Sequence, residues 1–524
     1  MAELVKDQVF LDQAVGSEEV QLMLEGDIIV PDIKPDMALL LQTDERLVID
    51  RTEASTDRVN YVGHLHINVL YVAKEFNKTV ESISLTRNLD DFVNLEGVTK
   101  DMWVRAKAEI VNIDYRVVND RKVNYRAVIS LQTSAEHKSA HDMVTHISGV
   151  PENQLLKASL NVNRTVEHKI DRFQVRDQVV LPATKPNLRE VLQTTASIAS
   201  RDVRIMSGRV NLGGVLSVTA LYRGDSANTD GAKDSLLEIF ETELPFNGPV
   251  EVPGATEDMY TDVALQVLDQ HITIRADEDG EDRVLDIEVS VGVQLKVYST
   301  ETVSILEDAY SINQQLNFSK TVVRYPQHVC INNNQAPVKE VVALAEGAPD
   351  MLQIFRVKGQ VVTDETRVID DKVIVEGAIN TDILYVAESD ATPLASYRTV
   401  IPYRQVIEAK GAMPGMAANV DIAIDHAAFN MLSKREIEVR FQLTYATQVV
   451  RQEEANIIGD VEITDIDPDT LANQPSMTVY IVQPGDNLWK IAKKYNSPLD
   501  ELIAVNELDP TTRVTPGQKL LMLK

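Results

Sequence analysis

Cysteine is almost absent from this chain of 524 residues, which contains only Cys330. A single thiol excludes an intramolecular disulfide framework and any metal site built on paired thiolates. Basic residues are also scarce: 51 Lys and Arg stand against 80 Asp and Glu, a formal net charge of −29. Binding to nucleic acid or to an anionic membrane surface relies on Lys and Arg, so this balance argues against both partners.

Long hydrophobic runs are missing as well. No segment approaches the ~18 uninterrupted apolar residues that a membrane-spanning helix needs. The opening MAELVKDQ lacks the basic start and apolar stretch of a secretion signal, so we expect no transmembrane segment and a cytoplasmic location. Apolar residues still make up 44 % of the chain, enough for a folded core. The length predicts about three or four domains.

What the chain does contain is an internal repeat. Three prolines are each followed, 36 residues later, by the tyrosine of a Leu-Tyr pair, and a glycine stands eight residues before each tyrosine. The three sets are Pro35, Gly63 and Tyr71; Pro186, Gly214 and Tyr222; and Pro349, Gly377 and Tyr385. The prolines are 151 and 163 residues apart, so the repeat unit has the size of a domain.

Each repeat contains strands with one apolar and one polar face. Leu65, Ile67 and Val69 alternate with His64 and His66, and the corresponding segments of the other repeats alternate in the same way. This period of two is typical of antiparallel sheets with one solvated side. The glycine within each strand indicates a bulge or a close backbone approach. Helix is expected only in short pieces, for instance around 185–195.

We therefore predict a mainly β protein with three repeated antiparallel β-sandwich-like domains, followed by a small α+β domain of order βααβ. The segment 452–477 holds seven carboxylates and neither Lys nor Arg, which favours a self-repelling linker. The predicted boundaries are residues 1–150, 151–318 and 319–451 for the repeats, 452–477 for the acidic linker and 478–524 for the terminal domain.

The terminal domain begins with a short strand, and Asp486 is suited to cap the helix that follows. A second helix is expected to begin after Ser497, which would cap it, and Pro498 would lie in its first turn. The pattern Tyr480-x-Val482-x-x-Gly485-Asp486-x-Leu488-Trp489-x-Ile491-Ala492, then Leu502-x-x-x-Asn506, then Val514-x-Pro516-Gly517-Gln518-x-Leu520, closely resembles the LysM family.

The LysM resemblance implies a shallow groove that binds N-acetylglucosamine, between the loop after the first strand and the loop before the last. The residues that we expect to contribute to binding are Gly485, Asp486, Asn487, Leu488, Trp489, Asn506, Leu508, Asp509, Pro510 and Thr511. Leu488 would also be a core residue in any such fold.

The rest of the chain resembles the SPOCS-domain family, on the basis of the repeated Lys-Pro signature, the Leu-Tyr strands and the domain order. Repeat three departs from the signature, with Ala348 where the others have Lys34 and Lys185. In that family the C-terminal LysM is implied to bind a protein partner, a SpoIVA-like coat ATPase, on the mother-cell face of the forespore.

Residues that could carry chemistry do not converge in the sequence. His64 and His66 have no histidine at the equivalent positions of the other repeats, which favours a solvated face over a metal site. His137 and His141 have the spacing of a helical metal pair but lack the glutamate of a zinc protease. Cys330 lacks the context of an activated nucleophile. We expect no catalytic residue, no metal and no cofactor.

The favoured hypothesis is a non-enzymatic sporulation scaffold that binds its coat partner through the LysM domain and helps localise the coat around the forespore. The alternative is a cell-wall protein that binds peptidoglycan or N-acetylglucosamine. Against this stand the missing export signal and the single module, since avidity needs several linked sites. A third hypothesis, an enzyme within the β repeats, has no convergent acid, base or nucleophile to support it.

Overall fold

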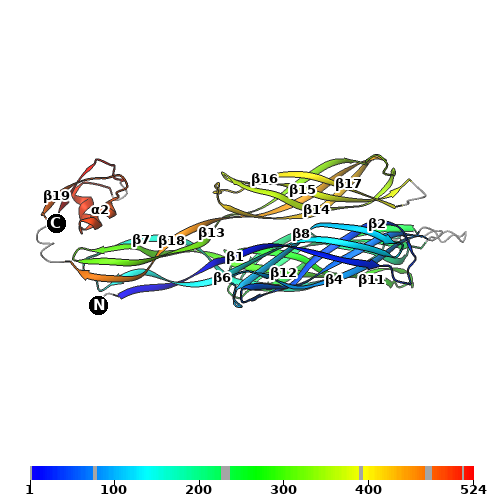
Figure 1. Cartoon of the computed structure of the whole chain (residues 1–524), viewed down its shortest axis with the longest axis horizontal. Coiled ribbons are helices and arrows are strands. Elements are labelled where there is room, and N and C mark those ends of the chain that lie inside the picture. Colours follow the sequence, from blue (N-terminus) through cyan, green and yellow to red (C-terminus); the bar gives the residue numbers. More distant parts are fainter. Residues whose placement is uncertain are drawn as a thin grey trace.

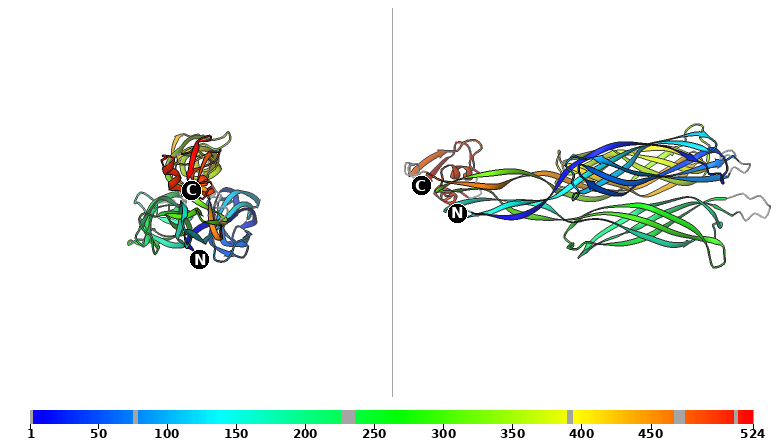
Figure 2. Two further views of the ribbon diagram at one scale, coloured as in Figure 1. Left: turned by 90° about the vertical axis from the view of Figure 1, so that its left-hand side faces the viewer. Right: turned by 60° about the horizontal axis from the view of Figure 1, so that its bottom comes forward.

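The protein is elongated, with a narrow stalk and a small domain at the tip of the stalk (Figure 1), and its body has three lobes (Figure 2, left). The computed structural model describes residues 3–74, 79–225, 236–388, 394–466, 475–509 and 513–523. Both ends of the chain lie at the stalk end of the molecule (Figure 1). Over these ranges the two helices both belong to the small domain, and the rest of the regular structure is strand.

Each repeat contributes six strands in the same order. The first has β1 (Glu3–Ile29), β2 (Met37–Ser55), β3 (Arg58–Ala73), β4 (Val80–Asn94), β5 (Trp103–Asn119) and β6 (Lys122–Ser148). The second has β7 (Asn153–Val180), β8 (Leu188–Met206), β9 (Arg209–Gly224), β10 (Leu236–Glu251), β11 (Tyr260–Ala276) and β12 (Asp282–Ser311). The third has β13 (Gln314–Ala343), β14 (Met351–Ile369), β15 (Lys372–Ala387), β16 (Leu394–Glu408), β17 (Ala417–Ser433) and β18 (Glu436–Asp465).

The six strands of a repeat form two three-stranded antiparallel sheets. In the first repeat their orders are β1-β6-β5 and β2-β3-β4, and the other repeats reproduce both. The sheets face each other across an apolar core, where Leu65 and Ile67 from β3 pack with Val123 and Tyr125 from β6. The mainly β, repeated antiparallel architecture predicted from the alternating pattern is confirmed.

The repeated glycine marks a close approach of two backbones, as predicted. A Cβ atom on Gly63 would lie 2.3 Å from the carbonyl oxygen of Val48, and one on Gly214 would lie 2.2 Å from that of Ser200. Gly377 is in the same position, 2.2 Å from the carbonyl oxygen of Val362. A register shift of the partner strand lies beside each glycine. No larger residue fits there without moving the backbone.

The three lobes surround a common axis (Figure 2, left). Leucines of the Leu-Tyr pairs lie on it, because Leu70, Leu221 and Leu384 share one apolar cluster. The first two repeats also meet through ion pairs. Arg223 is 9 % exposed and contacts Glu81 of the first repeat at 2.8 Å, and Lys34 contacts Glu190 of the second repeat at 3.1 Å.

The stalk is made of three β-ribbons, the pairs β1–β6, β7–β12 and β13–β18, and it extends from the body toward the two termini (Figure 2, right). We define it as residues 3–14 with 136–148, 153–165 with 298–311, and 314–328 with 450–465. A register shift at the same depth in every ribbon marks its base. The ribbons enclose a shared core, so no repeat buries its stalk residues alone. This core contains Val9, Leu11 and Met143; Val162 and Ile305; and Val323, Tyr325, Ala455 and Ile457.

The stalk corrects the predicted linker. Residues 452–465 complete β18 and pair with β13 as far as Gln314 and Asp465. This stretch contains the carboxylates of Glu453 and Glu454, yet the residues that follow them, Ala455, Ile457 and Ile458, are buried. Apolar contacts with two other ribbons therefore decide the structure of a segment whose composition is that of a linker.

The helix expected around 185–195 is also corrected, since β8 begins at Leu188. Apolar residues at Leu188, Val191 and Leu192 have helical spacing. Register shifts between Leu188 and Glu190 and between Val191 and Gln193 produce this spacing within a strand. Two bulges interrupt the period of two, and the remaining pattern imitates a helix.

Candidate functional site

The small terminal domain has the predicted βααβ order. It consists of β19 (Met477–Ile481), α2 (Leu488–Lys494), α3 (Leu499–Val505) and β20 (Lys519–Leu523), with β19 and β20 paired antiparallel. Its apolar core is formed by Val482, Leu488, Trp489, Ile491, Ala492, Leu502, Leu520 and Met522, with Tyr310 from the stalk. The two short helices are thus held against one face of a two-stranded sheet.

The loop between β19 and α2 is fixed by Asp486. Its carboxylate accepts hydrogen bonds from the Tyr480 hydroxyl, at 2.7 Å, and from the Gln483 backbone N–H, at 2.8 Å. These bonds, the first more than the second, hold the pKa of Asp486 below its usual value. The same hydrogen bond raises the pKa of Tyr480 to about 12. Gly485 lies in the left-handed region with φ +88, which favours glycine in this turn.

The helix caps differ from those predicted. Asn487, and not Asp486, caps α2, because its side-chain oxygen accepts from the Lys490 backbone N–H at 2.8 Å. Asp486 is engaged with Tyr480 and cannot serve both roles. Pro498 occupies the cap position of α3 without a side-chain hydrogen bond, while the Ser497 hydroxyl donates to the Leu523 carbonyl oxygen.

The two groove loops lie on the surface. Gly485, Asn487 and Asp509 are exposed, and Leu508 is half-buried against the core of the domain. Leu488 is 8 % exposed and belongs to that core. Pro510 and Thr511, also predicted for the groove, fall outside the described residues. The exposed residues among the described part of the groove are therefore a glycine and small polar residues.

Two predicted binding residues have polar atoms that are bonded within the protein. The Asn506 amide donates to the carbonyl oxygens of Leu502 and Leu521 and accepts from the Leu521 N–H, so it ties α3 to β20. The Trp489 indole N–H donates to Asp308 of the stalk at 3.0 Å. The sequence motif places both residues beside the groove, and only the fold shows that their polar atoms have partners elsewhere.

The histidine candidates do not converge. The Nδ1 of His64 contacts Asp50 at 2.9 Å, and that of His66 contacts the Thr86 hydroxyl at 3.0 Å. His137 and His141 lie on strand β6, where four residues span ~13 Å, too far for two ligands of one ion. In the described parts of the chain, no three metal-binding side chains gather.

Cys330 is half-buried at the register shift of the third ribbon. Burial raises the pKa of its thiol, which keeps the group protonated and weakly reactive.

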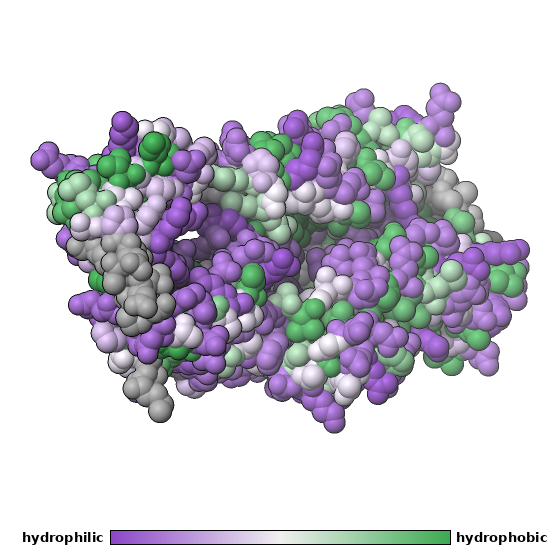
Figure 3. Space-filling view, turned by 60° about the vertical axis from the view of Figure 1, so that its left-hand side comes forward, coloured by the Kyte–Doolittle hydropathy of each residue, from purple (hydrophilic) through white to green (hydrophobic). Residues whose placement is uncertain are grey.

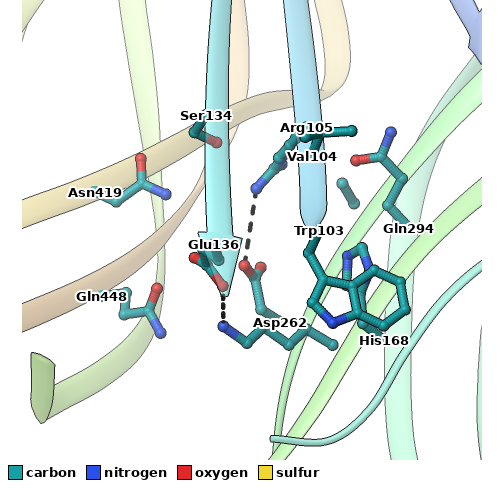
Figure 4. A pocket seen from close by; sticks show the side chains of 12 residues that line it. Trp103, Val104, Arg105, Ser134, Glu136, His168, Asp262, Gln294, Asn419 and Gln448 are labelled. Carbon is teal, nitrogen blue, oxygen red and sulfur yellow. Dashed lines mark hydrogen bonds and ion pairs between the residues drawn. The ribbon is translucent and has the colours of Figure 1, made fainter. Parts of the chain in front are cut away.

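A polar cavity of about 220 Å³ lies where the three repeats meet the stalk (Figure 4). Its charged groups are paired: Arg105 lies 3.8 Å from Asp262, and Lys296 lies 2.5 Å from Glu136. Burial, with Lys296 next, lowers the pKa of His168 to about 4, so the imidazole is neutral. Sequence reasoning missed this cavity because its walls come from three repeats.

The face of the molecule drawn in Figure 3 has no large hydrophobic patch, because its hydrophobic residues form small groups among hydrophilic ones. Within the described ranges, neither helix has the length and apolar character needed to cross a bilayer.

Comparison with known families agrees with this architecture. The family model described as SipL, SPOCS domain, matches residues 36–118, 187–275 and 350–432, one match in each repeat. The LysM domain model matches residues 480–522. No curated protein and no solved structure matches the chain significantly. The two models together match more than half of the sequence. The chain therefore belongs to the SipL type of sporulation-related protein, with three SPOCS domains followed by one LysM domain.

Proposed function

We propose that this protein is a non-enzymatic sporulation scaffold whose LysM domain binds a coat morphogenetic partner, a SpoIVA-like ATPase, in the mother-cell cytosol at the forespore surface. The observation that carries the proposal is the position of the LysM domain. It lies at the tip of a stalk to which all three SPOCS repeats contribute, with its groove loops on the surface (Figure 1). Such an arrangement holds a binding module away from the body.

The chemistry of the described residues supports a binding role over catalysis. SPOCS and LysM are non-catalytic domain types. The charged groups of the junction cavity are held in ion pairs, and burial keeps its His168 neutral. Groups that perform acid–base or nucleophilic chemistry have to meet within hydrogen-bond reach.

The test uses the purified full chain, a chain ending at residue 466, and a purified SpoIVA-like coat ATPase as the probe. We expect the full chain to retain the ATPase and the shortened chain to lose it while its body unfolds at an unchanged temperature. Equal retention by both chains would place the partner site on the SPOCS repeats. Retention by neither would contradict the proposed partner.

Glycan binding is the second candidate function, favoured by the LysM match and by the exposure of Gly485 and Asn487. Calorimetry of the full chain with N-acetylglucosamine oligomers tests it. Because a single module gains no avidity, we expect at most weak binding, and micromolar affinity would favour the cell-wall role.

A further inference from the structure

One carboxylate of the stalk accepts two hydrogen bonds from the LysM domain. Asp308 of β12 accepts hydrogen bonds from the Trp489 indole N–H, at 3.0 Å, and from the Lys493 ammonium group, at 2.6 Å. Both oxygen atoms of Asp308 are used, and its side chain is 18 % exposed. Trp489 and Lys493 lie on α2, so the face of this helix that carries them is turned toward the stalk.

Tyr310, two residues further along β12, completes the contact. Its ring lies edge-on to that of Trp489, with centroids 5.0 Å apart, and its hydroxyl donates to the Ser497 carbonyl oxygen at 2.8 Å. Tyr310 is 3 % exposed and Trp489 is 9 % exposed. Side chains two residues apart on a strand point to the same side, so Asp308 and Tyr310 form one receptor face.

The threefold repetition of the stalk provides an internal comparison. Each ribbon has a register shift near its tip, and residue 308 aligns with His146 and Asp460 of the other ribbons. Residue 310 likewise aligns with Ser148 and Glu462. Neither of these can supply an aromatic edge. The pairing of a carboxylate with a tyrosine therefore occurs on one of three otherwise similar faces, and that face holds the LysM domain.

We propose that the α2 face of the LysM domain is a receptor for a strand presenting Asp-x-Tyr, that the stalk occupies it in cis, and that the docked domain is the closed state of a latch. Trp489 and Lys493 are withheld in this state, whereas the groove loops around Gly485 stay accessible. A glycan in the groove binds the closed state. A protein partner with a similar acidic and aromatic strand has to displace the stalk. This deepens the proposed function and rests on it for the identity of the partner.

Tryptophan fluorescence of the free protein tests the latch. The chain has only two tryptophans, so one substitution leaves a single reporter. In a Trp103→Phe background, Trp489 is the single reporter. We expect Asp308→Ala to shift its emission to the red and to increase its quenching by acrylamide. The matched control is Asp460→Ala, the equivalent position of the third ribbon, which should leave both unchanged. An unchanged emission in the Asp308 variant, or an equal change in both, would overturn the proposal.

Hydrogen exchange shows whether the domain has opened or unfolded. Amides inside the domain should stay protected in Asp308→Ala if only the docking is lost, such as those of Leu521, which donates to the Asn506 side chain, and Val482, which donates to the Gln518 carbonyl oxygen. Loss of this protection would mean that Asp308 is needed for the domain fold, and it would overturn the latch.

Affinity for the SpoIVA-like ATPase then measures the regulation. Opening the latch should tighten binding by about threefold or more, because the closed fraction lowers the apparent affinity. Equal affinity of Asp308→Ala and Asp460→Ala for the ATPase would show that the partner does not use α2. If neither binds, the proposed partner is wrong, while the fluorescence result on docking stands.

Discussion

The hydroxyl of Tyr71 donates a hydrogen bond to the carbonyl oxygen of Pro35, 3.0 Å away. The same bond joins Tyr222 to Pro186 at 3.3 Å, and Tyr385 to Pro349 at 3.0 Å. The constant 36-residue spacing of the repeat is thus the chain length between the partners of one hydrogen bond. It fixes the turn before β2 against the end of β3, and the equivalent elements in the other repeats.

Replacing Tyr71 by Phe should cost about 1 kcal/mol of stability, because the half-buried Pro35 carbonyl loses its partner. Tyr222→Phe and Tyr385→Phe should cost similar amounts. Denaturant unfolding of the three variants measures this. A loss confined to one variant would show that the bond does not have the same role in all repeats.

Alanine at Gly214 should destabilise the protein by more than about 2 kcal/mol, because its Cβ would meet the Ser200 carbonyl oxygen. Its neighbour Gly213 is the matched control. A Cβ there has no neighbour closer than 3.8 Å, so Gly213→Ala should stay within about 0.5 kcal/mol of the parent. Thermal unfolding compares the two, and equal effects would disprove the close approach.

Glu81→Gln should cost about 3 kcal/mol, because it leaves Arg223 buried with less countercharge between the first two repeats. In the second repeat, Glu238 pairs with Lys185 at 2.5 Å, but both side chains are about one-third exposed. Glu238→Gln should therefore cost less than about 1 kcal/mol. The third repeat has Ala348 and Ala395 at these positions. Urea unfolding checks the order, and a larger loss for Glu238→Gln would refute it.

A chain ending at residue 451 should be much less stable than one ending at residue 466. The shorter chain loses Ile457 and Ile458, which are 6 % and 1 % exposed, and burial of two isoleucines contributes about 3–6 kcal/mol. Denaturant unfolding of both truncations measures this loss. Equal stability would show that the last part of β18 adds nothing to the stalk.

Docking of the LysM domain should weaken in acid. Burial alone would raise the pKa of Asp308, but hydrogen bonds from Lys493 and Trp489 outweigh it, and the pKa lies below its usual value. The undocked carboxyl returns to its ordinary pKa, so docking is fully favoured above that value and is lost as the pH falls through the lowered one. Trp489 emission should hold to about pH 5 and change only below about pH 4. A transition near pH 6.5 would implicate a histidine instead.

The sequence predicted the strands of the repeats because each sheet has one polar face, as the alternation around Leu65 and Ile67 shows. It also predicted the order of elements in the LysM domain. The stalk was not predictable, because the residues that bury Ala455 and Ile457 come from ribbons over a hundred residues away in sequence. The acidic composition of residues 452–465 carries no information about these distant contacts, and by itself it favoured a solvated linker.

The candidate site was predicted in part. The LysM motif located the loop at Gly485, which lies on the surface, and the placement of Pro510 and Thr511 stays a prediction. Trp489 and Asn506 were assigned to binding because motif residues combine structural and functional roles. Only the contact with Asp308 shows that Trp489 faces the stalk. The sole available signal was that Tyr310 has no aromatic counterpart at Ser148 or Glu462.

The shared interior of the three ribbons also governs how the chain is made. Many multidomain proteins complete one unit after another as they emerge from the ribosome. Here the core that contains Val9 and Leu11 is complete only when β18 has been synthesised, hundreds of residues later. A prematurely terminated product would expose apolar residues of this incomplete core. The LysM domain follows β18 in the chain, so it is synthesised only after all three ribbons of the stalk.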